Sequence, residues 1–262
     1  MLMCLDVGNT NIVMGIFDGK RLLGSFRFST ERNRTADEIG VVIKNLLSEL
    51  KIAREQVEGI IIASVVPPLD RYLVEMCNKY FGHEPLMVGP GIKTGMPIRT
   101  DNPREVGADL IAGSIAAYEL YGKKSDEHSE RPVIIIDFGT ATTFGAVSAF
   151  GEYLGVAIAP GIQIAADALF SRAAKLLRVD LVFPDSAIGK NTVQSMQAGL
   201  TIGFLGLIEK LIIKIKAELG PDTFVVATGG LAGLMADKIP MIDTLHENLV
   251  MEGLRIIYGR NN

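Results

Sequence analysis

The chain has 262 residues, of which 48% are hydrophobic and 21% are charged, and its formal net charge is −4. This length and composition predict a large buried core, and the acidic balance argues against nucleic acid as a partner. The two cysteines, Cys4 and Cys77, form no disulfide framework, so a cytoplasmic location is expected. The most apolar long stretch, 202–215, contains Glu209, Lys210 and Lys214, and no membrane partner is expected.

The first part of the chain shows strand and helix patterns in alternation. Thr35-Ala36-Asp37-Glu38 offers a helix cap before apolar residues at helical spacing, and Gly24 is a candidate bulge. The predicted elements are strands 2–6, 12–17 and 22–27, a helix at 35–50, a strand at 57–64, a helix at 69–81 after Pro67-Pro68, a short strand at 86–88 and a helix at 105–120.

The second part repeats this plan after a charged segment, 122–131, that is expected to be a solvated loop or hairpin. The predicted elements are strands 133–137, 143–147 and 153–158, helices 162–176 and 193–218, a strand at 223–227 and a helical segment at 231–238. Together the two parts predict an α/β fold built from a duplicated three-strand meander with crossover helices.

One sequence motif, an aspartate and a glycine after an apolar strand, occurs in both parts. Asp6-Val7-Gly8-Asn9-Thr10-Asn11 and Asp137-Phe138-Gly139-Thr140-Ala141-Thr142-Thr143 each follow an apolar strand, and their aspartates lie 131 positions apart. The glycine lets the backbone approach a phosphate group, and the carboxylate would hold magnesium directly or through water. The pair therefore suggests a nucleotide site with a phosphate clamp on each wall of a cleft. The alternative is a plain hairpin turn capped by aspartate, with Thr142 and Thr143 explained by strand propensity.

Two further places carry candidate chemistry. Thr228-Gly229-Gly230 ends a buried strand, where bare backbone suits a nucleotide base or ribose, although Gly-Gly is equally a plain turn. Asp109 lies on an otherwise apolar helix, and an uncompensated buried carboxylate is costly. Asp109 therefore either caps the helix, pairs with Arg104, or acts as a general base in a partly desolvated pocket.

These residues give the chain a specific family resemblance. It resembles the type III pantothenate kinases of the actin and sugar-kinase superfamily. The motifs that carry the resemblance, in chain order, are Asp6–Asn11, Ala63–Pro67, Asn102–Asp109, Asp137–Thr143, Gly155–Gly161, Gly189–Thr192, Thr228–Gly230 and Gly253-Leu254. The resemblance implies two ribonuclease-H-like (actin-like ATPase) domains, 1–120 and 121–262, with mixed sheets flanked by helices and a cleft between the halves.

The resemblance also implies a reaction and its residues. The reaction is ATP-dependent phosphorylation of pantothenate to 4'-phosphopantothenate, the first step of coenzyme A biosynthesis, in a homodimer. Asp109 would be the general base, and Asp137 would hold a monovalent cation, K⁺ or NH₄⁺. Contacts with ATP and its Mg²⁺ would come from Asp6, Val7, Gly8, Asn9, Thr10, Asn11, Ile12, Val13, Thr140, Gly229 and Gly230. Contacts with pantothenate would come from Gly107, Ala108, Asp109, Leu110 and Thr192.

Two positions depart from the family pattern. Leu110 stands where the family has an arginine that contacts pantothenate, and Val156 stands in place of a glycine. Loss of a charged hydrogen bond would weaken binding by roughly 1.5–3 kcal/mol. The alternatives that follow are a weakly active or regulatory paralogue, or a kinase for another small alcohol.

Overall fold

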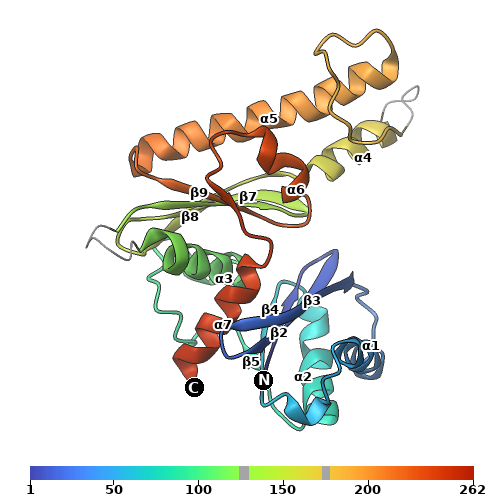
Figure 1. Ribbon diagram of the computed structural model, residues 1–262, viewed down its shortest axis with the longest axis vertical. Coiled ribbons are helices and arrows are strands. Elements are labelled where there is room, and N and C mark those ends of the chain that lie inside the picture. Colours follow the sequence, from blue (N-terminus) through green and yellow to red (C-terminus); the bar gives the residue numbers. More distant parts are fainter. Residues whose placement is uncertain (124–129, 173–177) are drawn as a thin grey trace. The chain divides into compact units, whose positions relative to one another are not determined.

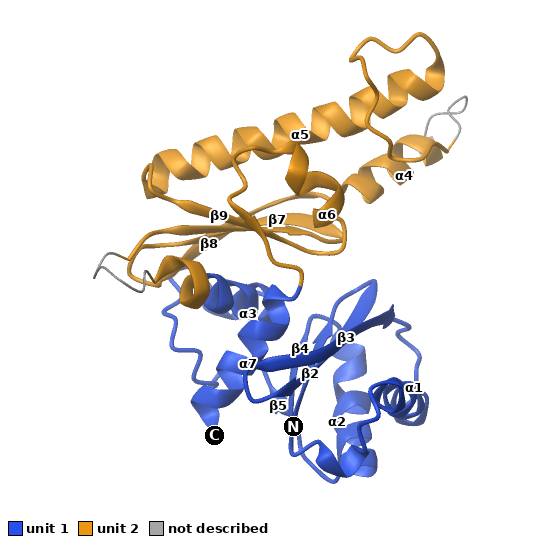
Figure 2. Ribbon diagram, in the orientation of Figure 1, with its two compact units in different colours: residues 1–117, 248–262 blue, residues 118–247 orange. Residues whose placement is uncertain are grey.

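A computed structural model describes residues 1–123, 130–172 and 178–262 of the chain. The chain separates into two compact units (Figure 2): unit 1 comprises Met1–Ala117 with Asn248–Asn262, and unit 2 comprises Tyr118–Glu247. These units differ from the expected halves 1–120 and 121–262 because the C-terminal segment packs with the first unit.

The elements of each unit follow the chain in order (Figure 1). Unit 1 contains β1 (Leu2–Val7), β2 (Asn11–Asp18), β3 (Arg21–Ser29), α1 (Ala36–Glu49), β4 (Gly59–Ser64), α2 (Pro67–Phe81), β5 (Leu86–Met87), α3 (Ala108–Ala117) and α7 (Leu249–Asn261), with short 3₁₀ turns at Arg54–Gln56 and Pro103–Glu105. Unit 2 contains a π-helical turn (Tyr118–Gly122), β6 (Val133–Phe138), β7 (Ala141–Val147), β8 (Tyr153–Pro160), α4 (Ile162–Arg172), α5 (Thr192–Leu219), β9 (Phe224–Thr228), α6 (Ala232–Met235), a 3₁₀ turn (Ala236–Lys238) and β10 (Thr244–Leu245).

The two units contain sheets of the same topology. The strand order is β3-β2-β1-β4-β5 in unit 1 and β8-β7-β6-β9-β10 in unit 2. In each sheet the central strand pairs antiparallel with the next strand and parallel with the strand that follows the crossover helix. The predicted duplication is confirmed, and so is the fold class of two mixed sheets flanked by helices.

Each sheet carries its own core. In unit 1, buried residues of β1 and β4 pack with Ile39 and Ile43 of α1 and with Leu69 and Leu73 of α2. In unit 2, α5 runs along the sheet (Figure 1) and contributes Ile208 to a core with the apolar run of β6. Burial of one helix stripe against each sheet face is the main stabilising contribution.

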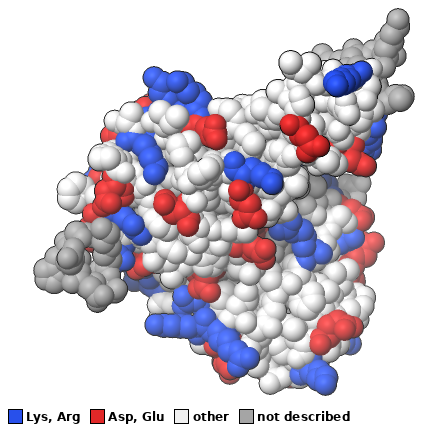
Figure 3. Space-filling view, turned by 45° about the horizontal axis from the view of Figure 1, so that its top comes forward, with Lys and Arg blue, Asp and Glu red and all other residues white. Residues whose placement is uncertain are grey.

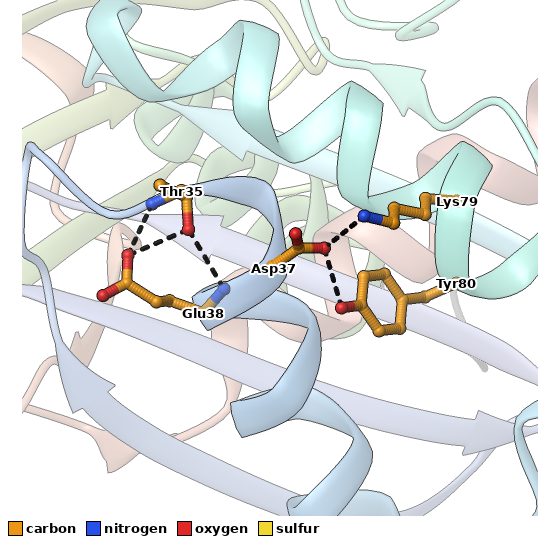
Figure 4. A network of polar contacts seen from close by, with 5 residues as sticks. All are labelled: Thr35, Asp37, Glu38, Lys79 and Tyr80. Atoms are coloured by element: carbon orange, nitrogen blue, oxygen red, sulfur yellow. Dashed lines mark hydrogen bonds and ion pairs between the residues drawn. The ribbon is translucent and has the colours of Figure 1, made fainter.

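The capping prediction for α1 is confirmed. The Thr35 side chain accepts a hydrogen bond from the Glu38 N–H, and the Glu38 carboxylate accepts one from the Thr35 N–H at 2.8 Å. In the same first turn, the Asp37 carboxylate joins α1 to α2 by accepting from Lys79 at 2.7 Å and from the Tyr80 hydroxyl at 2.8 Å (Figure 4). These contacts hold the start of α1 in a defined place.

Several boundaries differ from the sequence prediction. Pro67 and Pro68 begin α2 instead of preceding it, because proline at the first helical positions loses no intrahelical hydrogen bond. Helix α3 begins at Ala108, after the 3₁₀ turn, and not at 105. Helix α7 was not predicted. It packs beside α3 (Figure 1), where Gly253 lies against the Ala112 backbone with no room for a Cβ.

Some predictions fall partly outside the described residues. The helix predicted at 162–176 is described as far as Arg172, and the basic residues beyond that point lie outside the description. In the predicted loop or hairpin 122–131, Lys123 and Glu130 form an antiparallel bridge, and 124–129 lie outside the description. The bulge predicted at Gly24 is present, as the β2–β3 register shifts between Ile16 and Phe17.

Both cysteines are buried within unit 1. Burial raises the pKa of both thiols, and that of Cys77 rises to about 12. Since the thiolate is the reactive form, they serve as apolar core residues, as predicted. Within the described ranges, no helix has the length and apolarity needed to cross a membrane. On the face in Figure 3, basic and acidic side chains are intermixed over a large uncharged surface.

Candidate active site

The first copy of the repeated motif, Asp6–Asn11, forms the tight turn between β1 and β2. Asp6 is the penultimate residue of β1, and its side chain is half-buried. The Gly8 N–H donates to the Asn11 carbonyl at 3.0 Å, which closes the turn, while Asn9 and Thr10 are exposed at its tip. The turn therefore presents backbone and short polar side chains beside a carboxylate, as a phosphate site requires.

The second copy of the motif, Asp137–Thr143, forms the equivalent turn between β6 and β7, and this turn has one residue fewer. The Gly139 N–H donates to the Ala141 carbonyl at 3.1 Å. In the first hairpin the aspartate Asp6 lies opposite Val13, whereas in the second Asp137 lies opposite Thr143, one position closer along the chain. The two turns are thus similar in plan but place different side chains beside their aspartates.

A row of polar side chains crosses the sheet of unit 2 at Asp137. Thr143 on β7 and Thr228 on β9 lie directly opposite Asp137 in the two strand pairings, so all three side chains share one face. The Thr143 Oγ1 atom is buried and has no hydrogen-bond partner among the residues that the structure describes. Buried polar atoms normally have a partner, so this oxygen beside a carboxylate fits a bound cation.

Gly229 of the predicted site and Gly161 of the motif Gly155–Gly161 pack tightly around this second turn. Gly229 has a φ of +97°, and a Cβ there would collide with the Asp137 carboxylate and the Phe138 backbone. A Cβ on Gly161 would likewise collide with the Thr140 carbonyl. The structure therefore packs Gly229 against Asp137 and Gly161 against Thr140.

Asp109 lies in the first turn of α3 in unit 1. It is half-buried, and its carboxylate accepts a hydrogen bond from the Leu110 N–H at 2.8 Å. Desolvation by burial raises the pKa of this carboxyl, and the backbone hydrogen bond offsets only part of that effect. No ion pair between Asp109 and Arg104 is found in the described ranges, so the predicted pairing with that arginine is not observed.

Val65 connects Asp109 to the first turn. The Val65 N–H donates to the Val7 carbonyl at 3.0 Å, immediately after Asp6. On its other side, the Val65 side chain lies 3.6 Å from where a Cβ on Gly107 would stand. Gly107 also packs against the Asp109 carboxylate. Unit 1 thus brings the β1–β2 turn and the Gly107–Leu110 segment to the same region.

Thr192 lies in unit 2 at the first position of α5, whose N-cap is Asn191. It lines an open cavity of about 640 Å³ between α4 and α5. The lining residues are Leu169, Gly189, Lys190, Asn191, Thr192, Ser195, Met196, Gly199 and Leu200. The motif Gly189–Thr192, one of those that carry the family resemblance, therefore forms one wall of a cavity large enough for a small molecule.

The two departures from the family pattern lie in different surroundings. Leu110 is half-buried beside Asp109 in the first turn of α3. Val156 is 37% exposed on the edge strand β8, opposite Gly145 of β7. The added bulk at 156 therefore lies on an exposed strand face. Among the described residues, no group of three or more His, Cys, Asp or Glu is arranged to hold a metal ion.

A protein-family comparison decides the assignment. The family model described as type III pantothenate kinase matches residues 2–214. The chain belongs to the type III pantothenate kinase family. The chain is therefore a kinase, for which ATP with a divalent metal is the phosphoryl donor and pantothenate is the acceptor.

Individual relatives agree with the family model over the whole length. A Moorella thermoacetica protein named type III pantothenate kinase is 54% identical over 261 residues, covering 100% of both chains. Proteins of the same name from Geobacter sulfurreducens and Myxococcus xanthus are 51% and 49% identical, and each comparison covers 100% of this chain and 99% of the relative.

Solved structures share the fold at low sequence identity. A Baf family protein from Campylobacter jejuni has a TM-score of 0.60 at 18% identity, covering 99% of this chain and 98% of that chain. Component A of (R)-2-hydroxyglutaryl-CoA dehydratase from Acidaminococcus fermentans has a TM-score of 0.51 at 13% identity, covering 98% and 96%. Both likenesses concern the fold alone.

Sequence reasoning missed Thr30 and Arg32 and left the role of Thr143 open. The sequence allowed either a role in the motif or strand propensity for Thr143, whose hydroxyl lies beside Asp137 with no hydrogen-bond partner among the described residues. Thr30 and Arg32, which follow β3, contact the first turn, and no motif marked them. The one signal in the sequence is that Thr30 and Arg32 are polar and directly follow β3, whose end lies beside the β1–β2 turn.

Proposed function

We propose that the protein phosphorylates pantothenate with ATP to give 4'-phosphopantothenate, the first step of coenzyme A biosynthesis, and that Asp109 is the general base. The observation that carries the role of Asp109 is its place at the start of α3, half-buried and with a raised pKa, linked through Val65 to the first phosphate turn. A base works best when its pKa lies near the working pH, and burial shifts an aspartate in that direction.

The transfer is an in-line displacement in which positioning does most of the catalysis. The primary hydroxyl of pantothenate gives its proton to the Asp109 carboxylate while its oxygen bonds to the γ-phosphorus, and the bond to the leaving ADP oxygen breaks. A general base contributes roughly 10²–10⁴-fold to the rate of such a step. The resulting carboxylic acid later returns the proton to water.

The two turns would bind ATP. The segment Asp6–Val13 would contact the phosphates of ATP, with Asp6 holding Mg²⁺ directly or through water, and Thr140, Gly229 and Gly230 would contact the nucleotide. Magnesium keeps much of its hydration shell and needs few protein carboxylates, which agrees with a single aspartate at this turn. When bound there, Mg²⁺ would neutralise charge on the phosphates.

Asp137 would hold the monovalent cation, K⁺ or NH₄⁺. Supporting this role are the unpartnered Thr143 oxygen on the same sheet face and the tight packing of Gly229 against the carboxylate. A cation there would offset charge on the triphosphate, where other kinases place a lysine.

Pantothenate would be contacted by Gly107, Ala108, Asp109, Leu110 and Thr192. Leu110 offers only its backbone and an apolar side chain, so the substrate carboxylate loses a charged donor at that position. The open cavity at Thr192 supports a role for that residue in substrate binding.

A homodimer is proposed from the surface of unit 2. Leu154, Val156 and Ile158 alternate on one face of the edge strand β8 and are 40%, 37% and 67% exposed. Ile164 and Leu169 of the next helix, α4, are exposed as well. Apolar edge strands are normally covered, and a second copy of this chain would cover this one. A cytoplasmic location is proposed because ATP and an acceptor for coenzyme A synthesis meet there.

The test is an ADP-release assay on purified protein with Mg²⁺, K⁺ or NH₄⁺ and pantothenate up to millimolar concentration, with the wild type and Leu110→Arg run side by side. We expect turnover by the wild type and a pantothenate KM lower by about tenfold or more in the variant, as a charged hydrogen bond is regained. Absence of turnover in both proteins at every pantothenate concentration would refute the proposal. ATP binding without turnover, not repaired by Leu110→Arg, would favour a regulatory role.

A further inference from the structure

The segment after β3 is fastened to the first phosphate turn. The Thr30 N–H donates to the Thr10 carbonyl at 2.9 Å, and the Thr30 hydroxyl donates to the Gly8 carbonyl at 2.7 Å. Both acceptors belong to the turn, so two of its carbonyl groups are held by Thr30. Carbonyl oxygens repel phosphate oxygens, and these two are engaged by donors from the protein itself.

Arg32 makes the third contact with the same turn. Its Nη2 lies 3.2 Å from the Asn9 Oδ1. A guanidinium has only donors, so it can face only the oxygen of an amide side chain. The Asn9 NH₂ group is then turned away from Arg32, and its two N–H donors are presented elsewhere. Asn9 is exposed at the tip of the turn.

The segment that carries Arg32 is also held at its other end. Arg34 donates to Glu31 at 2.8 Å, and its guanidinium carbon lies 5.9 Å from the centre of the Phe28 ring. The Thr35–Glu38 capping box follows at once and fixes the start of α1 (Figure 4). Arg32 therefore stands on a short span anchored at Thr30 and at Thr35, which reduces the conformational freedom of its backbone.

We propose that Arg32 is a positioning residue for ATP, which sets the orientation of the Asn9 amide so that its NH₂ group donates to a phosphate oxygen. The inference rests on the assignment of Asp6–Val13 to ATP made above. Without Arg32 the amide is free to rotate and present its oxygen, an acceptor that repels phosphate. Arg32 also brings a positive charge to a turn that contains no lysine.

The test compares Arg32→Ala, Arg32→Lys, Asn9→Ala and the double variant Arg32→Ala/Asn9→Ala in the full-length protein. Binding of Mg·ATP is measured by calorimetry, and KM values for ATP and pantothenate are measured by ADP release. Arg54→Ala is the matched control, because Arg54 is an exposed arginine of unit 1 that pairs with its neighbour Glu55 and has no other ion pair within the described ranges. Melting temperatures check that each variant is folded.

We expect Arg32→Ala to weaken Mg·ATP binding about three- to tenfold and to raise the KM for ATP, with the pantothenate KM unchanged. Arg32→Lys restores much of the affinity, since an ammonium also donates to the amide oxygen. The double variant binds no more weakly than Asn9→Ala alone, because Arg32 acts through Asn9.

The outcomes separate this inference from the proposed function. Unchanged affinity in Arg32→Ala, or losses that add in the double variant, would overturn the positioning role while leaving the kinase assignment in place. A wild type that turns over pantothenate while Asn9→Ala binds Mg·ATP normally would do the same. Failure of the wild type to bind Mg·ATP at all would overturn the nucleotide assignment together with this inference.

Discussion

Gly229 lies directly against the Asp137 carboxylate, and a Cβ at 229 would overlap Oδ1 of that side chain. Gly229 also has a φ of +97°, where L side chains are strained. This relationship ties the end of β9 to the end of β6, so the orientation of the Asp137 carboxylate depends on the absence of a side chain on the neighbouring strand.

Gly229→Ala tests this dependence. The substitution strains the backbone and displaces the Asp137 carboxylate, and we expect a loss of about 1–3 kcal/mol of unfolding free energy and a higher K⁺ concentration for half-maximal activity. Urea unfolding and potassium titration of the kinase rate are the measurements. Gly233→Ala is the control, since a Cβ there meets nothing within 4 Å and alanine favours the helix. Equal effects at both positions would argue against a specific role for Gly229.

Thr143→Val removes a hydroxyl that has no hydrogen-bond partner in the described part of the chain. Because no hydrogen bond is lost, we expect unchanged or slightly higher stability. If the oxygen helps to hold the cation, the activity becomes less sensitive to K⁺ and saturates only at higher concentration. Thr223→Val provides the contrast, because the Thr223 hydroxyl donates to the Gly220 carbonyl at 2.6 Å and its removal is destabilising. An unaltered K⁺ titration in Thr143→Val would exclude Thr143 from the cation site.

Asp109→Asn separates catalysis from stability. The amide keeps an oxygen to accept from the Leu110 N–H but cannot take a proton from the substrate. We expect kcat to fall by roughly 10²–10⁴-fold. At neutral pH the unfolding midpoint rises, because a partly buried charge is no longer desolvated. The exposed neighbour Asp101 offers the control Asp101→Asn, for which both quantities remain at wild-type values.

The pH dependence follows from the direction of the Asp109 shift. Burial raises the folded-state pKa above the unfolded value, so the folded state binds the proton more tightly. Stability therefore falls as pH rises through the window between the two pKa values, and the loss persists above it. The base must be ionised, so kcat/KM falls on acidification at a higher pH than an ordinary aspartate would dictate. An acid limb at the ordinary aspartate pKa would contradict this role.

Leu154→Asp tests the proposed dimer. The new charge lies on the exposed apolar face of β8, and its burial against a second copy would be costly. Leu154 is preferred to Ile158, because Ile158 pairs with Thr143 beside the proposed cation site. We expect light scattering to show dimers for the wild type and monomers for the variant. Val41→Asp on the exposed side of α1 should leave the dimer intact. A wild-type monomer would refute the proposal directly.

The sequence predicted the sheets well because their signals are local. The apolar runs before Asp6 and Asp137, the glycine turns and the capping box at Thr35 each involve residues within a few positions of one another. Helix α7 was missed. It returns to pack on α3 of the first unit, and its contact between Gly253 and Ala112 joins residues far apart in sequence.

Sequence alone determined the family, the duplicated strand plan and the candidate residues, because motif order and strand periodicity can be read along the chain. Only the tertiary structure decided which atoms meet at the two turns. It placed the unpartnered Thr143 hydroxyl beside Asp137, and it placed Thr30 and Arg32 on the turn of Gly8 and Asn9. Strand register and side-chain direction set these contacts, and both arise from pairing between segments that are separated in sequence.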